Sequence, residues 1–234
     1  MRLFFCYCIY LCSTFIGNAQ IDTLAVEKDL KKLIDSSTIN YSVGNYIKSL
    51  SYDIEIIKKA QEIQNINYLQ KGYRFLGYDY LILEDIELAK TNFEKATYYA
   101  TLINNDTVTA KNYMDLGGIY SYTPEDYNKA ISYHKKSIAL FKKLNDTTFL
   151  SEAYYNTVLT AFKNNQYDDA LPYLNNATAL SSNQNDHFKH SLNNVWAEYF
   201  IEKEEYKKAD TYIHAVLKDT IKNLTTLELE SVYE

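Results

Sequence analysis

Apolar residues recur at helical spacing along most of this chain. Tyr73, Leu76 and Tyr80 stand at i, i+3 and i+7, which places them on one face of a helix. A second apolar run begins at Ala89 and continues through Phe93, after an acidic stretch. The pattern predicts two amphipathic helices joined by a short turn. Neither helix can bury its apolar face alone, so neighbouring pairs must stack.

The predicted helix pair recurs along the chain. A small residue in the second helix of each copy falls at steps of 40, 41, 40 and 39 residues, at Ser49, Ala89, Ala130, Ala170 and Ala209. Asparagine recurs at steps of 40 where one copy gives way to the next, at Asn65, Asn105, Asn145 and Asn185. An internal period of this size indicates a repeat architecture.

The repeated pattern resembles the tetratricopeptide repeat family, in which each unit is a helix–turn–helix. Its signature runs aromatic, Leu-Gly, Tyr, Ala, aromatic, Ala, and one copy matches every place with Tyr73, Leu76, Gly77, Tyr80, Ala89, Phe93 and Ala96. In the next copy His134 stands where the aromatic residue belongs, and in the fourth copy Val158 stands where the glycine belongs. The resemblance implies an all-α fold, a right-handed α-solenoid of about five units. The period of about 40 residues exceeds the usual 34 of the family.

We expect the following division of the chain. A signal peptide would cover residues 1–19, and the repeat array residues 20–217. The units would lie near 22–64, 65–105, 106–145, 146–185 and 186–220, and residues 221–234 would open a truncated sixth unit, as in the front part of a longer protein. Gly77 costs about 1 kcal/mol of helix propensity, and we expect it to let the two helices of its unit approach closely.

The first 20 residues have the layout of a secretory signal. Arg2 precedes an apolar run that ends at Ile16, and Ala19 offers a cleavage site. A retained membrane anchor and a lipoprotein modified at Cys12 are the alternatives. The sequence therefore predicts an exported protein of the periplasm or cell envelope of a Gram-negative bacterium.

Composition and charge exclude few classes of function. The formal charge of −6 weighs against a nucleic-acid partner, which would need a basic face. His187 and His190 have a spacing that could place two metal ligands on one helical face, but they lie where polar capping residues are expected. No nucleophile triad, phosphate loop or paired-carboxylate motif stands out. We therefore predict no enzyme, no cofactor and no metal.

In the tetratricopeptide repeat family the ligand usually lies along the concave face formed by the first helices. Counted from the Leu-Gly positions, the residues expected to contact a ligand are Lys71, Arg74, Tyr78, Lys111, Met114, Tyr122, Tyr155, Phe162, Asn194 and Glu198. The aromatic members of this set would suit an extended peptide or a partner helix. They could equally pack against neighbouring helices.

The resemblance implies a non-catalytic scaffold that binds a protein or peptide. It is similar to the exported repeat region of bacterial sensor histidine kinases and transcriptional regulators, which implies a role in signal transduction and membrane attachment only through a further segment. The alternative is a free-standing scaffold for envelope assembly or an accessory protein for glycan uptake.

Overall fold

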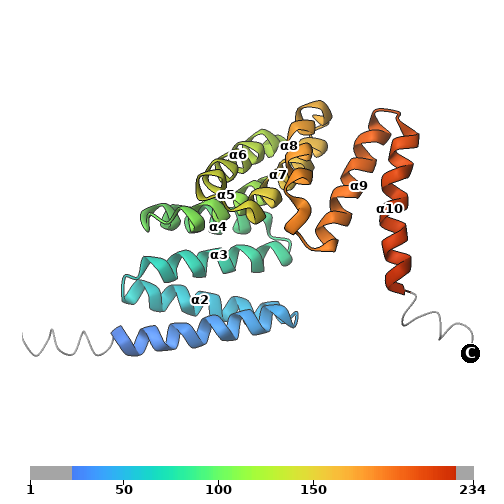
Figure 1. Ribbon diagram of the computed structural model, residues 1–234. Helices are drawn as coiled ribbons and strands as arrows, with labels where there is room; N and C mark the ends of the chain where they lie inside the picture. Colours follow the sequence, from blue (N-terminus) through green and yellow to red (C-terminus); the bar gives the residue numbers. More distant parts are fainter. Residues whose placement is uncertain (1–22, 225–234) are drawn as a thin grey trace, which may run out of the picture. The chain divides into compact units, whose positions relative to one another are not determined.

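The computed structural model describes residues 23–224, and every regular element in that range is a helix (Figure 1). The all-α class predicted from the pattern is therefore confirmed. Residues 1–22 and 225–234, which include the predicted signal peptide, lie outside the described part. The chain divides after Asn105 into two compact units, and each is described by itself.

In the described part of the first unit, residues 23–105, the chain forms four helices. A leading helix covers residues 23–42, and it is followed by α2 (Tyr46–Glu62), α3 (Ile66–Ile82) and α4 (Ile86–Leu102). Helix α3 packs on both α2 and α4. Ile57 and Ala60 of α2 meet Leu69 and Leu76 of α3 in the core of this unit.

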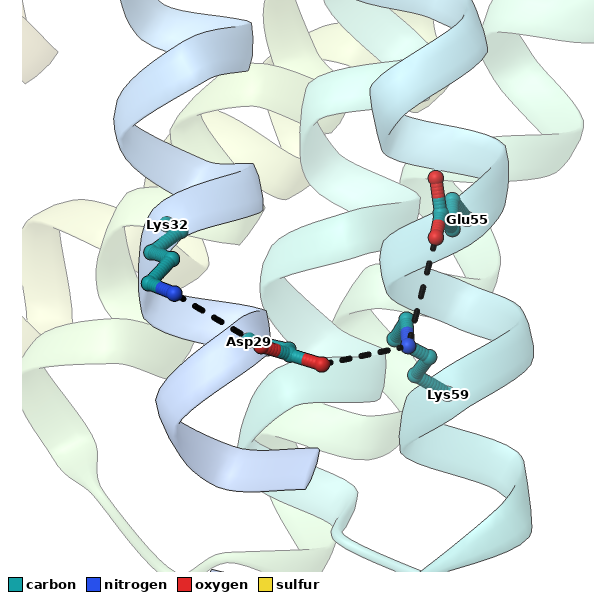
Figure 2. Close-up of polar contacts among 4 residues, drawn as sticks. All are labelled: Asp29, Lys32, Glu55 and Lys59. Carbon is teal, nitrogen blue, oxygen red and sulfur yellow. Dashed lines mark ion pairs between the residues drawn. The ribbon is translucent and has the colours of Figure 1, made fainter. Parts of the chain in front are cut away.

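Ion pairs join the leading helix to α2 on the surface of the first unit (Figure 2). The Lys59 ammonium lies 3.6 Å from the Asp29 carboxylate across the two helices and 4.0 Å from Glu55 on its own helix. Asp29 also lies 3.9 Å from Lys32. Half of the Asp29 side chain is exposed, and exposed pairs of this kind contribute at most about 1 kcal/mol each.

Residues 106–224 of the second unit form six α-helices and two single-turn helices. The α-helices are α5 (Asp106–Tyr120), α6 (Tyr127–Leu144), α7 (Thr147–Lys163), α8 (Tyr167–Ala179), α9 (Asp186–Glu202) and α10 (Tyr206–Leu224), and the 3₁₀ turns are η1 (Pro124–Asp126) and η2 (Ser181–Asn183). Neighbouring helices pack in chain order. The core extends from Ala110 of α5 to Tyr199 of α9. Helix α10 is continuous to Leu224, so residues 221–224 belong to this helix, and the rest of the expected sixth unit lies outside the described residues.

Side chains cap many of the helix starts. Asn65 accepts hydrogen bonds from the amides of Asn67 and Tyr68 at 3.1 and 3.3 Å. Asn185 accepts one from the Phe188 amide at 2.8 Å. Such caps satisfy backbone donors that have no partner within the helix. The recurring asparagines therefore mark helix ends for a physical reason.

Gly77 and Gly117 stand where two helices approach closely. A Cβ atom added to Gly77 would lie 2.9 Å from the ring of Phe93, and one added to Gly117 would lie 2.3 Å from the ring of His134. Contacts that short do not occur without a shift of the neighbour. The expected role of Gly77 in helix approach is confirmed.

Candidate functional site

A cavity of about 150 Å³ opens in the first unit between the leading helix, α2 and α3. Its walls are mostly apolar and its lining residues are Ser37, Thr38, Tyr41, Ser49, Asp53, Phe75 and Tyr78. We call it the Asp53 pocket. Of the residues expected to contact a ligand, Tyr78 lies in this wall.

The repeat register explains why a cavity forms here. Asp53 follows the small residue Ser49 by four positions, as Phe93 follows Ala89. The Phe93 ring is almost fully buried and packs against Gly77. An aspartate is too small to fill the space that a phenylalanine ring would occupy. The pocket is therefore open where the next repeat is filled.

Two aspartates are buried in this part of the first unit. Asp53 of α2 and Asp79 of α3 are both 0% exposed, and among the described residues none of their four carboxylate oxygens is paired with a cation or a backbone amide. The polar groups that act on them are the two acids themselves and the hydroxyls of Ser37 and Ser49. Burial raises the pKa of Asp53 to about 8, with a smaller contribution from nearby Asp79 and an opposing one from the Ser37 hydroxyl. Burial also raises the pKa of Asp79. An unpaired buried carboxylate is costly, so the proton-bearing form is favoured.

Polar groups of the leading helix complete the surroundings of Asp53. The hydroxyls of Ser37 and Ser49 lie 3.3 Å apart, one on the leading helix and one on α2. Burial raises the pKa of the Tyr41 hydroxyl, and Tyr46 and Asp79 raise it further. The Tyr41 ring meets the Tyr46 ring edge-on at 5.3 Å. The pocket thus combines aromatic walls with one buried acid, Asp53, which is next to a second, Asp79.

Arg74 lies beside the pocket wall. Its guanidinium donates a 3.0 Å hydrogen bond to the Tyr78 hydroxyl and lies 5.3 Å from the centre of the Tyr78 ring. These two predicted contact residues are therefore brought together. Lys71 is exposed on the same helix, and its ammonium lies 5.8 Å from the centre of the Tyr68 ring.

The predicted contact residues of α5 and the turn after it lie at or near the surface of the second unit. The Lys111 ammonium lies 3.9 Å from the centre of the Phe149 ring. Met114 is half-buried against the core. Tyr122 is 56% exposed, and the Lys163 ammonium lies 5.4 Å from the centre of its ring. Two of the predicted contact residues, Lys111 and Tyr122, therefore take part in contacts between a cation and an aromatic ring.

The predicted contact residues of α7 and α9 have mixed environments. Tyr155 is half-buried, with its ring 5.4 Å from that of Phe188. Asn194 and Glu198 are exposed on α9. Phe162 is only 4% exposed and packs at 4.6 Å against the Tyr167 ring, so it belongs to the core and offers little surface to a ligand.

Sequence reasoning missed Asp53 and Asp79. The available signal was an acid, Asp53, at a repeat position where the other copies carry Phe93, His134, Leu174 and Ile213. The first three are buried, whereas Ile213 in the last copy is 39% exposed. A charged residue in the register of a buried aromatic is a mismatch, and such mismatches concentrate at functional or strained sites.

The remaining candidates give no further site. Within residues 23–224, no group of three or more His, Cys, Asp or Glu side chains is placed to hold a metal ion. His187 and His190 lie in the first turns of α9. The helices of the same range include none that combines the length and the apolar character needed to cross a membrane.

Comparison with solved structures shows which fold this is. BtubC from P. vanneervenii superposes with a TM-score of 0.75 at 16% identity, over 88% of this chain and 86% of that one. A Podosopora anserina putative kinesin light chain with nearly identical TPR-like repeats gives 0.71 at 10% identity, over 85% and 97%. The chain has the tetratricopeptide-repeat fold. At these identities the likeness shows the fold alone.

A third structure with the tetratricopeptide-repeat fold is a signal-transduction ATPase from Pyrococcus horikoshii. It carries a tetratricopeptide repeat sensor and gives a TM-score of 0.70 at 13% identity, over 86% of this chain and 31% of that one. No family model matches the sequence, and no curated protein matches it. In the tetratricopeptide-repeat fold found here, the predicted contact residues lie on the first helices α3, α5, α7 and α9 or just after them.

Proposed function

We propose that this protein is a non-catalytic repeat scaffold that binds a protein or peptide along its first helices. The observation that carries the proposal is the set of cations that rest on aromatic rings there: Arg74 on Tyr78, Lys111 on Phe149, and Lys163 on the exposed Tyr122. Aromatic and arginine side chains are enriched where proteins bind one another. Repeat folds commonly present such extended binding surfaces.

A peptide selection would test this proposal. Random peptides displayed on phage are selected on the full chain, and the affinities of the selected peptides are measured by calorimetry. We expect Tyr122→Ala to weaken binding by about tenfold or more, the loss of one well-packed aromatic contact. Tyr98→Ala is the matched control, because Tyr98 is similarly exposed, at 60%, on the second helix α4. Failure to select any peptide, or equal losses from both variants, would contradict the proposal.

We also propose that the protein is exported and acts in signalling. The signal-like pattern of the first 20 residues supports export, and the repeat sensor of the Pyrococcus horikoshii protein offers a parallel for signalling. Expression in a Gram-negative host followed by amino-terminal sequencing tests export, with Gln20 expected as the first residue. A cytosolic product that retains Met1 would overturn it. Signalling requires a membrane helix and a kinase or DNA-binding signature in the reading frame beyond Glu234, and a stop codon after one further repeat would favour the free-standing scaffold.

A further inference from the structure

The Asp53 pocket has the size and chemistry of a side-chain pocket. Its volume is about 150 Å³, and a cavity of roughly that volume in another protein holds a benzene molecule. A lysine side chain beyond its Cα atom is slightly smaller than benzene in heavy atoms. The walls include Tyr41, Phe75 and Tyr78, which suit an alkyl stem and a cationic tip.

Among the described residues, no cation is paired with the acidic groups at the pocket. Both carboxylates are fully buried, and within residues 23–224 neither is paired with a cation or a backbone amide. Asp53 belongs to the pocket wall itself. The groups that influence Asp53 are Ser37 and Asp79, and no cation is among them. An ammonium group donates up to three hydrogen bonds and would give the buried acids a charged partner, where the described residues offer them only each other and the hydroxyls of Ser37 and Ser49.

We propose that the Asp53 pocket binds the side chain of a lysine from the partner segment, with the lysine ammonium placed against the carboxylate of Asp53, beside which Asp79 lies. This inference deepens the proposed function and rests on it, because the lysine comes from a bound peptide. Apolar walls and unpartnered acids together favour an alkylammonium group over a neutral apolar side chain. Arg74, held on Tyr78 beside the pocket, opposes the incoming charge.

Binding of the lysine should depend on pH in a defined direction. At neutral pH the carboxyl pair retains a proton, because burial raises the pKa of Asp53 to about 8. The entering ammonium displaces this proton. The affinity for the lysine peptide therefore rises as the pH is raised, by up to about tenfold per pH unit, and becomes constant above about pH 8. The polar and charged groups that face Asp53, or lie beside those that do, come from all three helices: Ser37, Tyr41, Ser49, Asp79, and Tyr78 with its partner Arg74.

The probes are a blocked pentapeptide with a central lysine, the same peptide with norleucine, the same peptide with acetyl-lysine, and free n-butylammonium. Binding to the full chain is measured by amide chemical shifts of α2 and α3 and by calorimetry at pH 6, 7 and 8. We expect the lysine peptide to change the chemical shifts of these amides. The norleucine and acetyl-lysine peptides should bind with an affinity lower by about tenfold or more. Butylammonium should bind the same place more weakly, because it lacks the peptide backbone.

Isosteric variants test the role of the acids. Asp53→Asn and Asp79→Asn should each weaken lysine-peptide binding by about tenfold or more. Arg74→Gln should strengthen it by about threefold, since one repelling charge is lost. Asp169→Asn is the matched control, because Asp169 is an exposed acid on α8 in the second unit, and it should change nothing.

The outcomes separate this inference from the proposed function. Equal binding of the lysine and norleucine peptides, or an Asp53→Asn variant that binds normally, would overturn the lysine pocket while leaving a peptide scaffold intact. Butylammonium binding without lysine-peptide binding would assign the pocket to free amines and overturn the peptide source. Selected peptides that bind only at the second unit would likewise support the scaffold and refute the pocket. An absence of any selected peptide would refute the proposed function itself.

Discussion

The two units place different buried polar residues at the same two positions of the repeat. In the first unit the positions carry Asp53 and Asp79, and in the second they carry His134 and Thr160. The members of each pair are 26 positions apart in the sequence. The His134 ring nitrogen Nε2 lies 3.2 Å from the Thr160 hydroxyl, within hydrogen-bond distance. The Nδ1 atom of the same ring has no hydrogen-bond partner among the described residues. The two aspartates lie beside each other, and no cation is paired with either of them within that range. The same repeat positions can thus hold either a bulky ring that packs the core or a pair of buried acids.

The comparison shows what each choice does to the surrounding space. His134 is fully buried, and its ring fills the space beside Gly117. Asp53, by contrast, leaves the space unfilled and lies in the wall of a cavity of about 150 Å³. A side chain that fills the core contributes stability, whereas a buried acid that lines a cavity costs stability but can bind a ligand there.

The largest expected difference is the response of the first unit to rising pH. The folded pKa of Asp53 is about 8 because of burial, against an ordinary value of 3.8, so the folded state holds a proton that the unfolded state releases. Stability is therefore full below about pH 4 and is lost as pH rises to 8, by roughly 3–5 kcal/mol. Amide hydrogen exchange of α3, corrected for the pH dependence of the intrinsic exchange rates, measures this loss of stability. Asp53→Asn should flatten the profile, and an unchanged profile would contradict a buried, proton-holding Asp53.

A smaller and opposite response is expected in the second unit. Burial lowers the pKa of His134 to about 4 from an ordinary 6.5, so the unfolded state binds a proton that the folded state does not. Stability is lost as pH falls from 6.5 to 4, by about 3 kcal/mol. Urea unfolding followed by the fluorescence of Trp196, the single tryptophan of the chain, reports this unit. His134→Leu, which copies the residue at Leu174, should remove most of the dependence, and a wild-type midpoint equal at pH 7 and pH 4.5 would refute it.

The smallest expected effect concerns the packing of the His134 ring. Gly117→Ala should destabilise the second unit by about 1–3 kcal/mol, because the new methyl group would lie 2.3 Å from that ring. Gly118→Ala is the adjacent control, since a Cβ there meets nothing within 4 Å. The control should be neutral or stabilising by up to about 1 kcal/mol, from helix propensity. Equal midpoints for the two variants in urea would show that the helix approach at Gly117 is adaptable.

The fold could be predicted from the sequence because its determinants are local and repeated. The small residues at Ala89 and Ala130, the glycines at Gly77 and Gly117, and the capping asparagines each act within one helix pair, so the period alone reveals them. The predicted contact residues were chosen by counting along the first helices, and that count cannot tell a surface ring from a core ring. Phe162 illustrates this, because its burial depends on Tyr167 and Tyr199.

The Asp53 pocket could not be predicted in the same way. It depends on three helices that meet in space, and on the difference in size between an aspartate and the phenylalanine of the next repeat. A repeat is recognised in the sequence from the residue types that its copies share. The pocket arises at a position where one copy has a different residue, Asp53 in place of a phenylalanine. The sequence alone does not single out Asp53 and Asp79, because only the structure shows that both are buried and lie beside each other.

The packing of each helix against its neighbours in the chain also governs how the protein folds. Within each unit, most contacts between helices are made by helices that are adjacent in the chain, so the entropy lost in closing loops is small and the relative contact order is low. Chains of that kind reach their native state quickly, and a nucleus can form at more than one helix pair. Folding of a newly made chain could therefore begin at several places, long before its last helix is available.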